Sequence, residues 1–135
     1  MPEISTGAGL LDTSVLVDPA ASTVLPAETS ISTLSLAELA AGPHATSDPA
    51  ERARRQERLQ TIEAMYDPLP FDAACARAYG RVYSATSATG RKARGRRAVD
   101  LLIAATAAAH DIPLYTRNPD DLRGLEAVVA IVDCR

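Results

Sequence analysis

The stretch AVDLLIAATAAAH, residues 98–110, decides how the rest of the chain is arranged. Between Val99 and Ala109 only Asp100 and Thr106 are polar, and the alanines and leucines that fill the stretch are strong helix formers. A helix that is apolar on every side packs in the interior of a domain. We therefore expect a buried helix that has one carboxylate near its N-terminal end.

Two interpretations of Asp100 are open at this point. In the first, Asp100 balances the partial positive charge of a helix N-terminus, which contributes under about 1 kcal/mol at a surface. In the second, it is a ligand in an active site, because a buried carboxylate is costly unless it is paired or binds a metal. The stretch by itself favours the first interpretation, and the rest of the chain reverses this preference.

Length and composition limit the class of protein. A chain of 135 residues with 47% hydrophobic residues is expected to form one globular domain over residues 1–135. No apolar run is long enough to span a membrane, and Met1-Pro2-Glu3 lacks the features of a signal peptide, so we expect a cytoplasmic protein without membrane contact. Cys75 and Cys134 fit no metal-binding spacing.

The positive charges are concentrated, although the net charge of −3 argues against nonspecific electrostatic binding of nucleic acid. Of the 14 basic residues, five fall in the sequence RKARGRR at 91–97, directly before the apolar helix. This stretch could be a solvated loop. Alternatively it is a phosphate-contacting edge, because the planar guanidinium of arginine can bind two phosphate oxygens at once.

The sequence GLLD at 9–12 predicts a short buried strand that stops at a carboxylate. Asp12 could be a turn or cap residue. It also lies at the carboxyl end of the first strand, where open α/β sheets bind their ligands. A short helix or turn is expected at 15–17, closed by Asp18-Pro19.

Residues 30–33 alternate in polarity and predict a second strand. The sequence SLAE at 35–38 matches a capping box, in which Ser35 would begin a helix and Glu38 would bond back to its backbone. This interpretation conflicts with a functional one, because a box carboxylate folds onto the backbone whereas a metal ligand points into a pocket. Gly42-Pro43 is expected to end this helix.

Two more helices are predicted in the middle of the chain. Asp48 and Pro49 predict the start of the first, whose core-facing stripe is expected to hold Leu59, Ile62 and Met65. Asp72 would cap the second, whose buried face is expected to hold Cys75, Tyr79, Val82 and Thr86. We interpret Tyr79 and Tyr83 as packing residues rather than as platforms for stacked bases.

The C-terminal part completes the predicted fold. A strand is expected at 114–116, a short helix opening at Pro119 with Asn118 as its cap, and a last buried strand within 126–132. The alternation of strands and helices predicts an α/β fold with a central, mainly parallel sheet and helices on both faces.

This topology brings four carboxylates to one rim of the sheet: Asp12, Glu38, Asp100 and Asp121. Carboxylates held close together repel one another. Mg²⁺ relieves this repulsion with one or two carboxylate ligands and keeps waters for a substrate phosphate, and Mn²⁺ accepts similar ligands. The sequence therefore predicts metal-dependent phosphodiester chemistry.

Four motifs, in this order along the chain, resemble those of PIN-domain ribonucleases, and most of all VapC-type toxins of bacterial toxin–antitoxin pairs: LDTSVL at 11–16, LAE at 36–38, DLLIAATA at 100–107 and LYTRNPDDL at 114–122. The resemblance implies a PIN-like three-layer α/β/α fold and Mg²⁺- or Mn²⁺-dependent cleavage of RNA by metal-activated water. It also implies neutralisation by a cognate antitoxin, and commonly a homodimer.

The resemblance also implies roles for individual residues. Asp12 and Asp100 would be the principal metal ligands, and Glu38 and Asp121 would complete the catalytic acids and could hold a second ion. Ser14 and Asn118 would support the pocket. The residues expected to bind RNA are Arg94, Arg96, Arg97 and Arg117. Asp120 leaves the fourth acid open by one position, although the spacing of the family favours Asp121, and Leu122 stands where the family commonly has Phe.

Other functions fit the residues less well. A phosphatase with an aspartyl nucleophile would have a second Asp at the position of Ser14, and the isolated His44 and His110 argue against a zinc site. The alternative kept open is a non-catalytic PIN-fold module that binds RNA or protein. The intact set of acids argues against it, because buried carboxylates are costly to keep.

Overall fold

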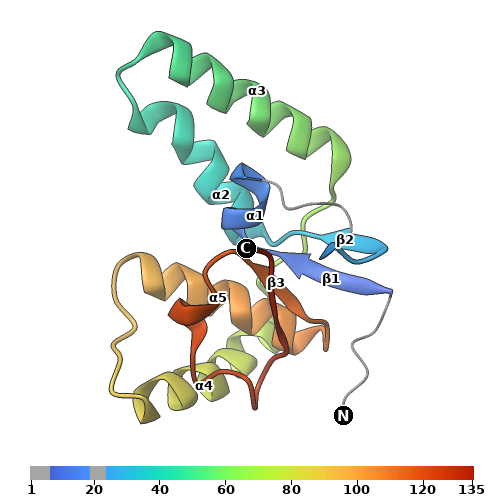
Figure 1. Cartoon of the computed structure of the whole chain (residues 1–135), viewed down its shortest axis with the longest axis vertical. Coiled ribbons are helices and arrows are strands. Elements are labelled where there is room, and N and C mark those ends of the chain that lie inside the picture. The colour runs from blue at the N-terminus through green and yellow to red at the C-terminus, as the bar shows by residue number, and fades with distance from the viewer. Residues whose placement is uncertain (1–6, 19–23) are drawn as a thin grey trace.

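A parallel β-sheet forms the centre of the computed structural model, which describes residues 7–18 and 24–135 (Figure 1). Its strands are β1 (Ala8–Leu11), β2 (Glu28–Ser30), β3 (Leu114–Thr116) and β4 (Ile131–Asp133), in the order β2-β1-β3-β4. Leu11 of β1 is paired in parallel with Tyr115 of β3. The carboxyl ends of these two central strands therefore lie side by side, as the sequence predicted.

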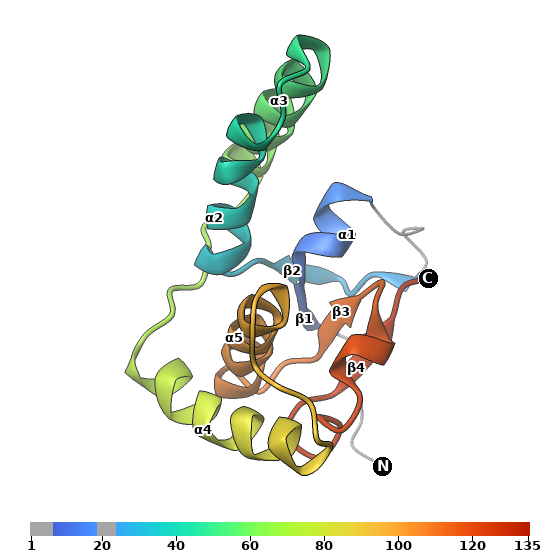
Figure 2. The ribbon, with the colours of Figure 1, turned by 90° about the vertical axis from the view of Figure 1, so that its left-hand side faces the viewer.

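Helices connect the strands and cover both faces of the sheet. The α-helices are α1 (Thr13–Val17), α2 (Thr33–Ala41), α3 (Pro49–Met65), α4 (Ala73–Ala88) and α5 (Arg96–Ala109). The 3₁₀ helices η2 (Gly42–Ala45) and η3 (Pro119–Leu122) follow α2 and β3. Figure 2 shows α2 and α3 as a pair that extends away from the sheet, whereas α4 and α5 pack together beside it.

The alternation of side chains along the strands divides the core in two. Leu10 and Leu114 face one side and pack with residues of α4 and α5, among them Val82 and Ile103. Leu11 and Tyr115 face the other side and pack with residues that include Val15, Leu16, Ile31 and Ile62. This two-sided burial is the three-layer α/β/α arrangement that the sequence predicted.

The apolar helix is buried as expected. In α5, Ile103, Ala104, Ala105, Thr106 and Ala107 have no exposed surface. The hydroxyl of Thr106 donates a hydrogen bond of 3.0 Å to the carbonyl of Leu102, so the one polar side chain in the middle of α5 is satisfied within the helix.

The expected capping box is wrong. Strand β2 ends at Ser30 rather than at 33, and α2 begins at Thr33 with Ser32 as its N-cap. The Ser32 hydroxyl oxygen accepts the backbone N–H of Ser35 at 3.1 Å, which is the bond expected of a cap. Because this cap comes three residues before Ser35, Glu38 lies in the second turn of α2, and its carboxylate is not used at the helix start.

Two further expectations need correction. The last strand covers Ile131–Asp133 rather than 126–132, because the backbone N–H groups of Val128 and Val129 bond to the carbonyl of Leu125 and form turns. Met65, expected in the core, is 67% exposed: it is the last residue of α3, and of the predicted stripe only Ile62 is buried. Residues 1–3 and Pro19, used above for localisation and for a turn, lie outside the described residues.

In the part of the chain that the structure describes, no helix combines the length and the apolar character needed to cross a bilayer.

The backbone of Gly9 passes directly under the Tyr115 ring, which generates a first prediction. A Cβ atom at this position would lie 2.8 Å from Tyr115 Cδ1 and 2.9 Å from Pro26 Cγ, inside contact distance. Gly9→Ala should therefore lower the free energy of unfolding by about 1–3 kcal/mol through overpacking. Thermal unfolding measures this change.

The matched control is Gly80→Ala, because a Cβ at Gly80 of α4 would meet no atom within 4 Å. This substitution should raise stability by up to about 1 kcal/mol, since alanine favours a helix. Equal behaviour of the two variants would contradict the packing described for Gly9.

Candidate active site

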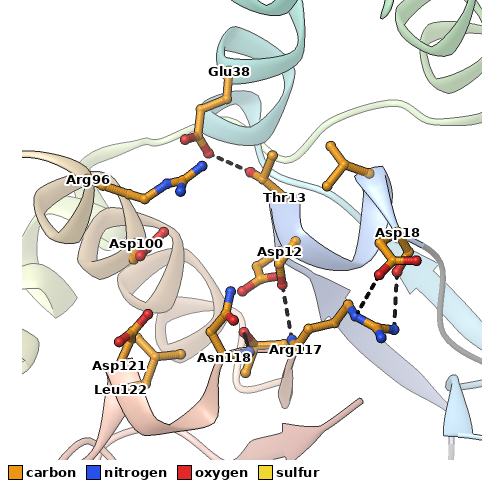
Figure 3. Close-up of a pocket in the computed structure, with 13 residues that line it drawn as sticks. Asp12, Thr13, Asp18, Glu38, Arg96, Asp100, Arg117, Asn118, Asp121 and Leu122 are labelled. Carbon is orange, nitrogen blue, oxygen red and sulfur yellow. Dashed lines mark hydrogen bonds and ion pairs between the residues drawn. The ribbon is translucent and has the colours of Figure 1, made fainter. Parts of the chain in front are cut away.

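One pocket of about 440 Å³ opens at the carboxyl ends of β1 and β3 and at the N-terminus of α5 (Figure 3). We call it the acidic pocket. The residues that line it are Asp12, Thr13, Ser14, Val17, Asp18, Glu38, Arg96, Asp100, Thr116, Arg117, Asn118, Asp121 and Leu122. All four carboxylates predicted from the sequence are among them, although they come from four separate segments of the chain.

Asp12 is both a helix cap and a pocket residue, so the two interpretations left open for it are compatible. It is 8% exposed, and its Oδ1 accepts the backbone N–H of Val15 at 3.3 Å, which caps α1. The Ser14 hydroxyl donates to the same oxygen and accepts the backbone N–H of Arg117 at 3.0 Å. Ser14 thus connects the end of β1 to the segment after β3 and fixes the orientation of Asp12.

Glu38 is oriented by Thr13, a residue to which the sequence analysis gave no individual role. The Thr13 hydroxyl donates a hydrogen bond to Glu38 Oε1 and also lies 3.0 Å from Ser35 Oγ. In Figure 3 the Glu38 carboxylate and the Arg96 guanidinium point toward one another. The position of Thr13, directly after Asp12, is the signal that could have identified it.

Asp100 lies in the second turn of α5, four residues after Arg96, and is partly buried. Burial, followed by the negative charges of Asp12 and Glu38, raises the pKa of Asp100 to about 6, although the positive charge of Arg96 acts in the opposite direction. The charged form of Asp100 is therefore costly in the folded protein unless a cation neutralises it.

The structure brings Asp121, rather than Asp120, to the acidic pocket. The Asp120 carboxylate points elsewhere and lies 3.4 Å from both Arg123 and Arg135. Asn118 stands at the N-cap position of η3, but its side chain makes no capping bond. Its amide is thus not used by the helix, and Figure 3 shows it pointing between Asp12 and Asp121.

The four arginines expected to bind RNA do not form one edge. Arg96 and Arg117 line the acidic pocket, and Arg117 is held by an ion pair of 3.3 Å with Asp18. Arg94 lines a different pocket. Arg97 lines neither of these two pockets, and its Nε is buried without a hydrogen-bond partner among the described residues.

The residues of the acidic pocket fit a hard divalent cation. Within residues 7–18 and 24–135, no three acidic, histidine or cysteine side chains are gathered closely enough to form a ready-made metal site. The fit is one of chemistry: the carboxylates of Asp12, Glu38, Asp100 and Asp121 line a single pocket, and burial together with the charges of Asp12 and Glu38 disfavours the charged form of Asp100. Mg²⁺ and Mn²⁺ prefer such donors, and Mg²⁺ usually keeps several water ligands.

Comparison with protein families matches residues 9–126 to the PIN domain. The chain is also 31% identical, over 129 residues, to Ribonuclease VapC5 of Mycobacterium tuberculosis (strain ATCC 25618 / H37Rv), and the match covers 92% of each chain.

Solved structures give a consistent result. The crystal structure of VapBC-5 from M. tuberculosis, a member of the VapBC family of toxin–antitoxin systems, holds a chain with 32% identity and a TM-score of 0.82, covering 96% of this chain and 98% of that one. For FitAcB from Neisseria gonorrhoeae the identity is 26% and the TM-score 0.72, with coverage of 93% and 96%.

The raised pKa of Asp100 generates a prediction about stability. Between its ordinary pKa of 3.8 and about 6 the folded protein binds more protons than the unfolded chain, so Asp100 favours folding at low pH and this contribution is lost as the pH rises. In EDTA at about pH 7.5, Asp100→Asn should therefore unfold at a higher temperature than the wild type. The difference should shrink at about pH 4.5, where Asp100 is protonated in the folded wild type.

Differential scanning calorimetry at the two pH values measures this effect. Glu63→Gln is the control, since it removes an exposed carboxylate of α3 that lines no part of the acidic pocket. A lower unfolding temperature for Asp100→Asn in EDTA at the higher pH would show that the Asp100 charge stabilises the metal-free fold, the opposite of what its raised pKa predicts.

Proposed function

This chain belongs to the PIN-domain family, and from that premise we propose that it is a metal-dependent endoribonuclease that acts as the toxin of a toxin–antitoxin pair. One observation carries the proposal. The four predicted carboxylates, Asp12, Glu38, Asp100 and Asp121, line one pocket in a chain that is 31% identical to a VapC ribonuclease over 92% of its length. A module that only binds has no use for four acids whose charges repel one another around one pocket.

In this proposal the position of each carboxylate in the pocket determines its role. Asp12 and Asp100, at the end of β1 and near the start of α5, hold the principal ion, and Glu38 and Asp121 face the same space from α2 and η3. When bound, Mg²⁺ would lower the pKa of a water and neutralise charge on the scissile phosphodiester. Thr13 and Ser14 keep Glu38 and Asp12 in place through their hydroxyl groups.

The two arginines of the pocket hold the substrate in this proposal. Arg96 and Arg117 border the carboxylates from α5 and from the segment after β3. A guanidinium can donate two hydrogen bonds to one phosphate group, so these side chains can orient the RNA backbone against the acids. The ion pair between Arg117 and Asp18 fixes the position of one of them before the substrate arrives.

The proposed antitoxin site is an apolar groove between α1 and α3. The groove has a volume of about 590 Å³, and its apolar lining comprises Leu11, Val15, Leu16, Val17, Leu25, Ile62, Met65 and Tyr66. Val17 and Met65 are 41% and 67% exposed, so burying them under a partner would be favourable. Because VapBC-5 is described as a toxin–antitoxin system, we propose an apolar segment of an antitoxin as the occupant.

The catalytic part of the proposal is tested with Asp12→Asn and Asp100→Asn. Each substitution should lower the rate of RNA cleavage in Mg²⁺ by more than about 100-fold, because even the loss of residues outside the first ligand shell costs 10–100-fold in metalloenzymes. The same loss is expected for the wild type in EDTA. Purified total RNA and sequencing of the new 5′ ends provide the measurement.

Induction of the same variants in cells separates an enzyme from a binding module. Growth arrest and new RNA ends should occur with the wild type and with the control Glu63→Gln, and not with the two Asp variants. Equal growth arrest by all four proteins, without new RNA ends, would reject catalysis and favour the PIN-fold binding module.

The antitoxin site is tested with Met65→Lys, which places a charge in the apolar groove. The variant should cleave RNA as the wild type does, but co-expression with the antitoxin should no longer restore growth. Gln60→Lys adds the same charge on an exposed position of α3 that does not line the groove, and should still be neutralised. If the antitoxin neutralises Met65→Lys as completely as Gln60→Lys, it binds elsewhere. If Met65→Lys instead changes the monomer–dimer equilibrium, the groove is assigned to a second copy of the chain.

A further inference from the structure

A second polar pocket, of about 430 Å³, lies where the end of α4 meets the loop that leads into α5. Three of its lining residues are the cations Arg91, Lys92 and Arg94, and none is acidic. We call it the basic pocket. In a chain with a net charge of −3 this local concentration of positive charge is the feature that an anion would recognise.

An aromatic ring borders the cations. Tyr83 lines the basic pocket and is 51% exposed, although the sequence suggested a packing role for it. Its ring lies 6.1 Å from that of Tyr79 at an angle of 50°, so Tyr79 supports the ring while half of the side chain stays open to solvent. An exposed ring beside cations is the arrangement on which single-stranded nucleic acids stack their bases.

The pocket also holds an unsatisfied hydroxyl group. Thr86, another lining residue, is 4% exposed, and its Oγ1 has no hydrogen-bond partner among the described residues. Buried polar atoms of this kind are uncommon in folded proteins and call for a partner.

The basic pocket adjoins the acidic pocket through two links. Arg91 donates a hydrogen bond of 2.8 Å to the carbonyl of Asp120, the residue before Asp121. Arg94 of the basic pocket and Arg96 of the acidic pocket are separated only by Gly95, so their Cα atoms lie within about 7 Å of each other. Figure 2 shows the loop between α4 and α5 that makes this connection.

We propose that the basic pocket is a second RNA subsite, which binds a phosphate and a stacked base of the same strand whose scissile phosphate lies in the acidic pocket. The proposal rests on the ribonuclease function proposed above and extends it to a strand that is at least partly unpaired, because Tyr83 can stack only on a base that has left a duplex. The cations hold the backbone, and Tyr83 holds the base.

The first test measures binding of a fluorescently labelled, random-sequence single-stranded RNA of about 12 nucleotides, a length within the range of single-strand binding sites. The titration is done in EDTA, so that no cleavage occurs and the acidic pocket contributes no metal contact. Lys92→Ala/Arg94→Ala should bind roughly 10-fold more weakly, and the slope of log affinity against log salt should become shallower by about one. The matched control Arg77→Ala/Arg81→Ala removes the same charge from exposed positions of α4 outside the pocket and should change both quantities much less.

The second test separates stacking from charge. Tyr83→Ala should weaken binding of the same RNA by about 5- to 10-fold, in the range of one lost base–aromatic stack. Tyr83→Phe keeps the ring and should bind as the wild type does. In cleavage assays with Mg²⁺, the pocket variants should raise KM and leave kcat unchanged, as expected for contacts away from the scissile bond.

Equal affinities and salt slopes for the two double variants would overturn the proposal, as would equal binding by Tyr83→Ala and Tyr83→Phe. Weakened binding of the antitoxin with unchanged RNA binding in Lys92→Ala/Arg94→Ala would assign the basic pocket to an acidic segment of that protein instead and would also overturn it. Wild-type protein that binds RNA in this way but cleaves none in Mg²⁺ would support the subsite while rejecting the ribonuclease function.

Discussion

The structure depends on burying a helix that has almost no polar surface while keeping a carboxylate at its start. The sheet and α4 enclose α5, whose residues from Ile103 to Ala107 are removed from solvent. Asp100 precedes this buried segment by less than one turn, so the packing that stabilises the fold also fixes where this charge lies. Its pKa of about 6 reflects that position.

Two further charges of the pocket, those of Asp12 and Glu38, are held by short hydrogen-bonded connections from α1. Ser14 orients Asp12 and bonds to the backbone at Arg117, and Thr13 orients Glu38 across the gap between α1 and α2. The hydroxyl groups of Thr13 and Ser14, which follow Asp12 directly in sequence, therefore connect the end of β1 to α2 and to the segment after β3. Arg96 and Arg117 place positive charge at its border, where a phosphate backbone would need it.

The sequence predicted the features that depend on long or directional patterns. The buried helix, the strands before Asp12 and at 114–116, and their common rim all follow from runs of apolar residues and from parallel topology. Asp12 and Asp100 could be placed because each lies at the end of such an element.

The errors concern choices between local alternatives of similar energy. Both Ser32 and Ser35 are residues of a type that caps helices. Strand β2 pairs with β1 as far as Ser30, and α2 begins at Thr33 with Ser32 as its cap, so the Glu38 carboxylate is not used at the helix start. Val128 and Val129 favour a strand but form turns, because β4 needs only three residues to pair with β3. Met65 and Tyr83 are exposed because no other element in the described part of the chain covers them. Helical periodicity predicts which residues share a face of a helix, but it does not predict how far another element covers that face.

The central claim is that the acidic pocket binds a divalent cation through Asp12 and Asp100. Calorimetric titration of the wild type and of Asp100→Asn with Mn²⁺, in buffers of different ionisation enthalpy, tests it directly. We predict that the wild type binds Mn²⁺ at neutral pH and releases protons on binding near pH 6, because a carboxyl group must ionise to become a ligand, and that Asp100→Asn loses this binding. Equal Mn²⁺ affinity in the two proteins, or binding of Mn²⁺ by neither, would contradict the claim.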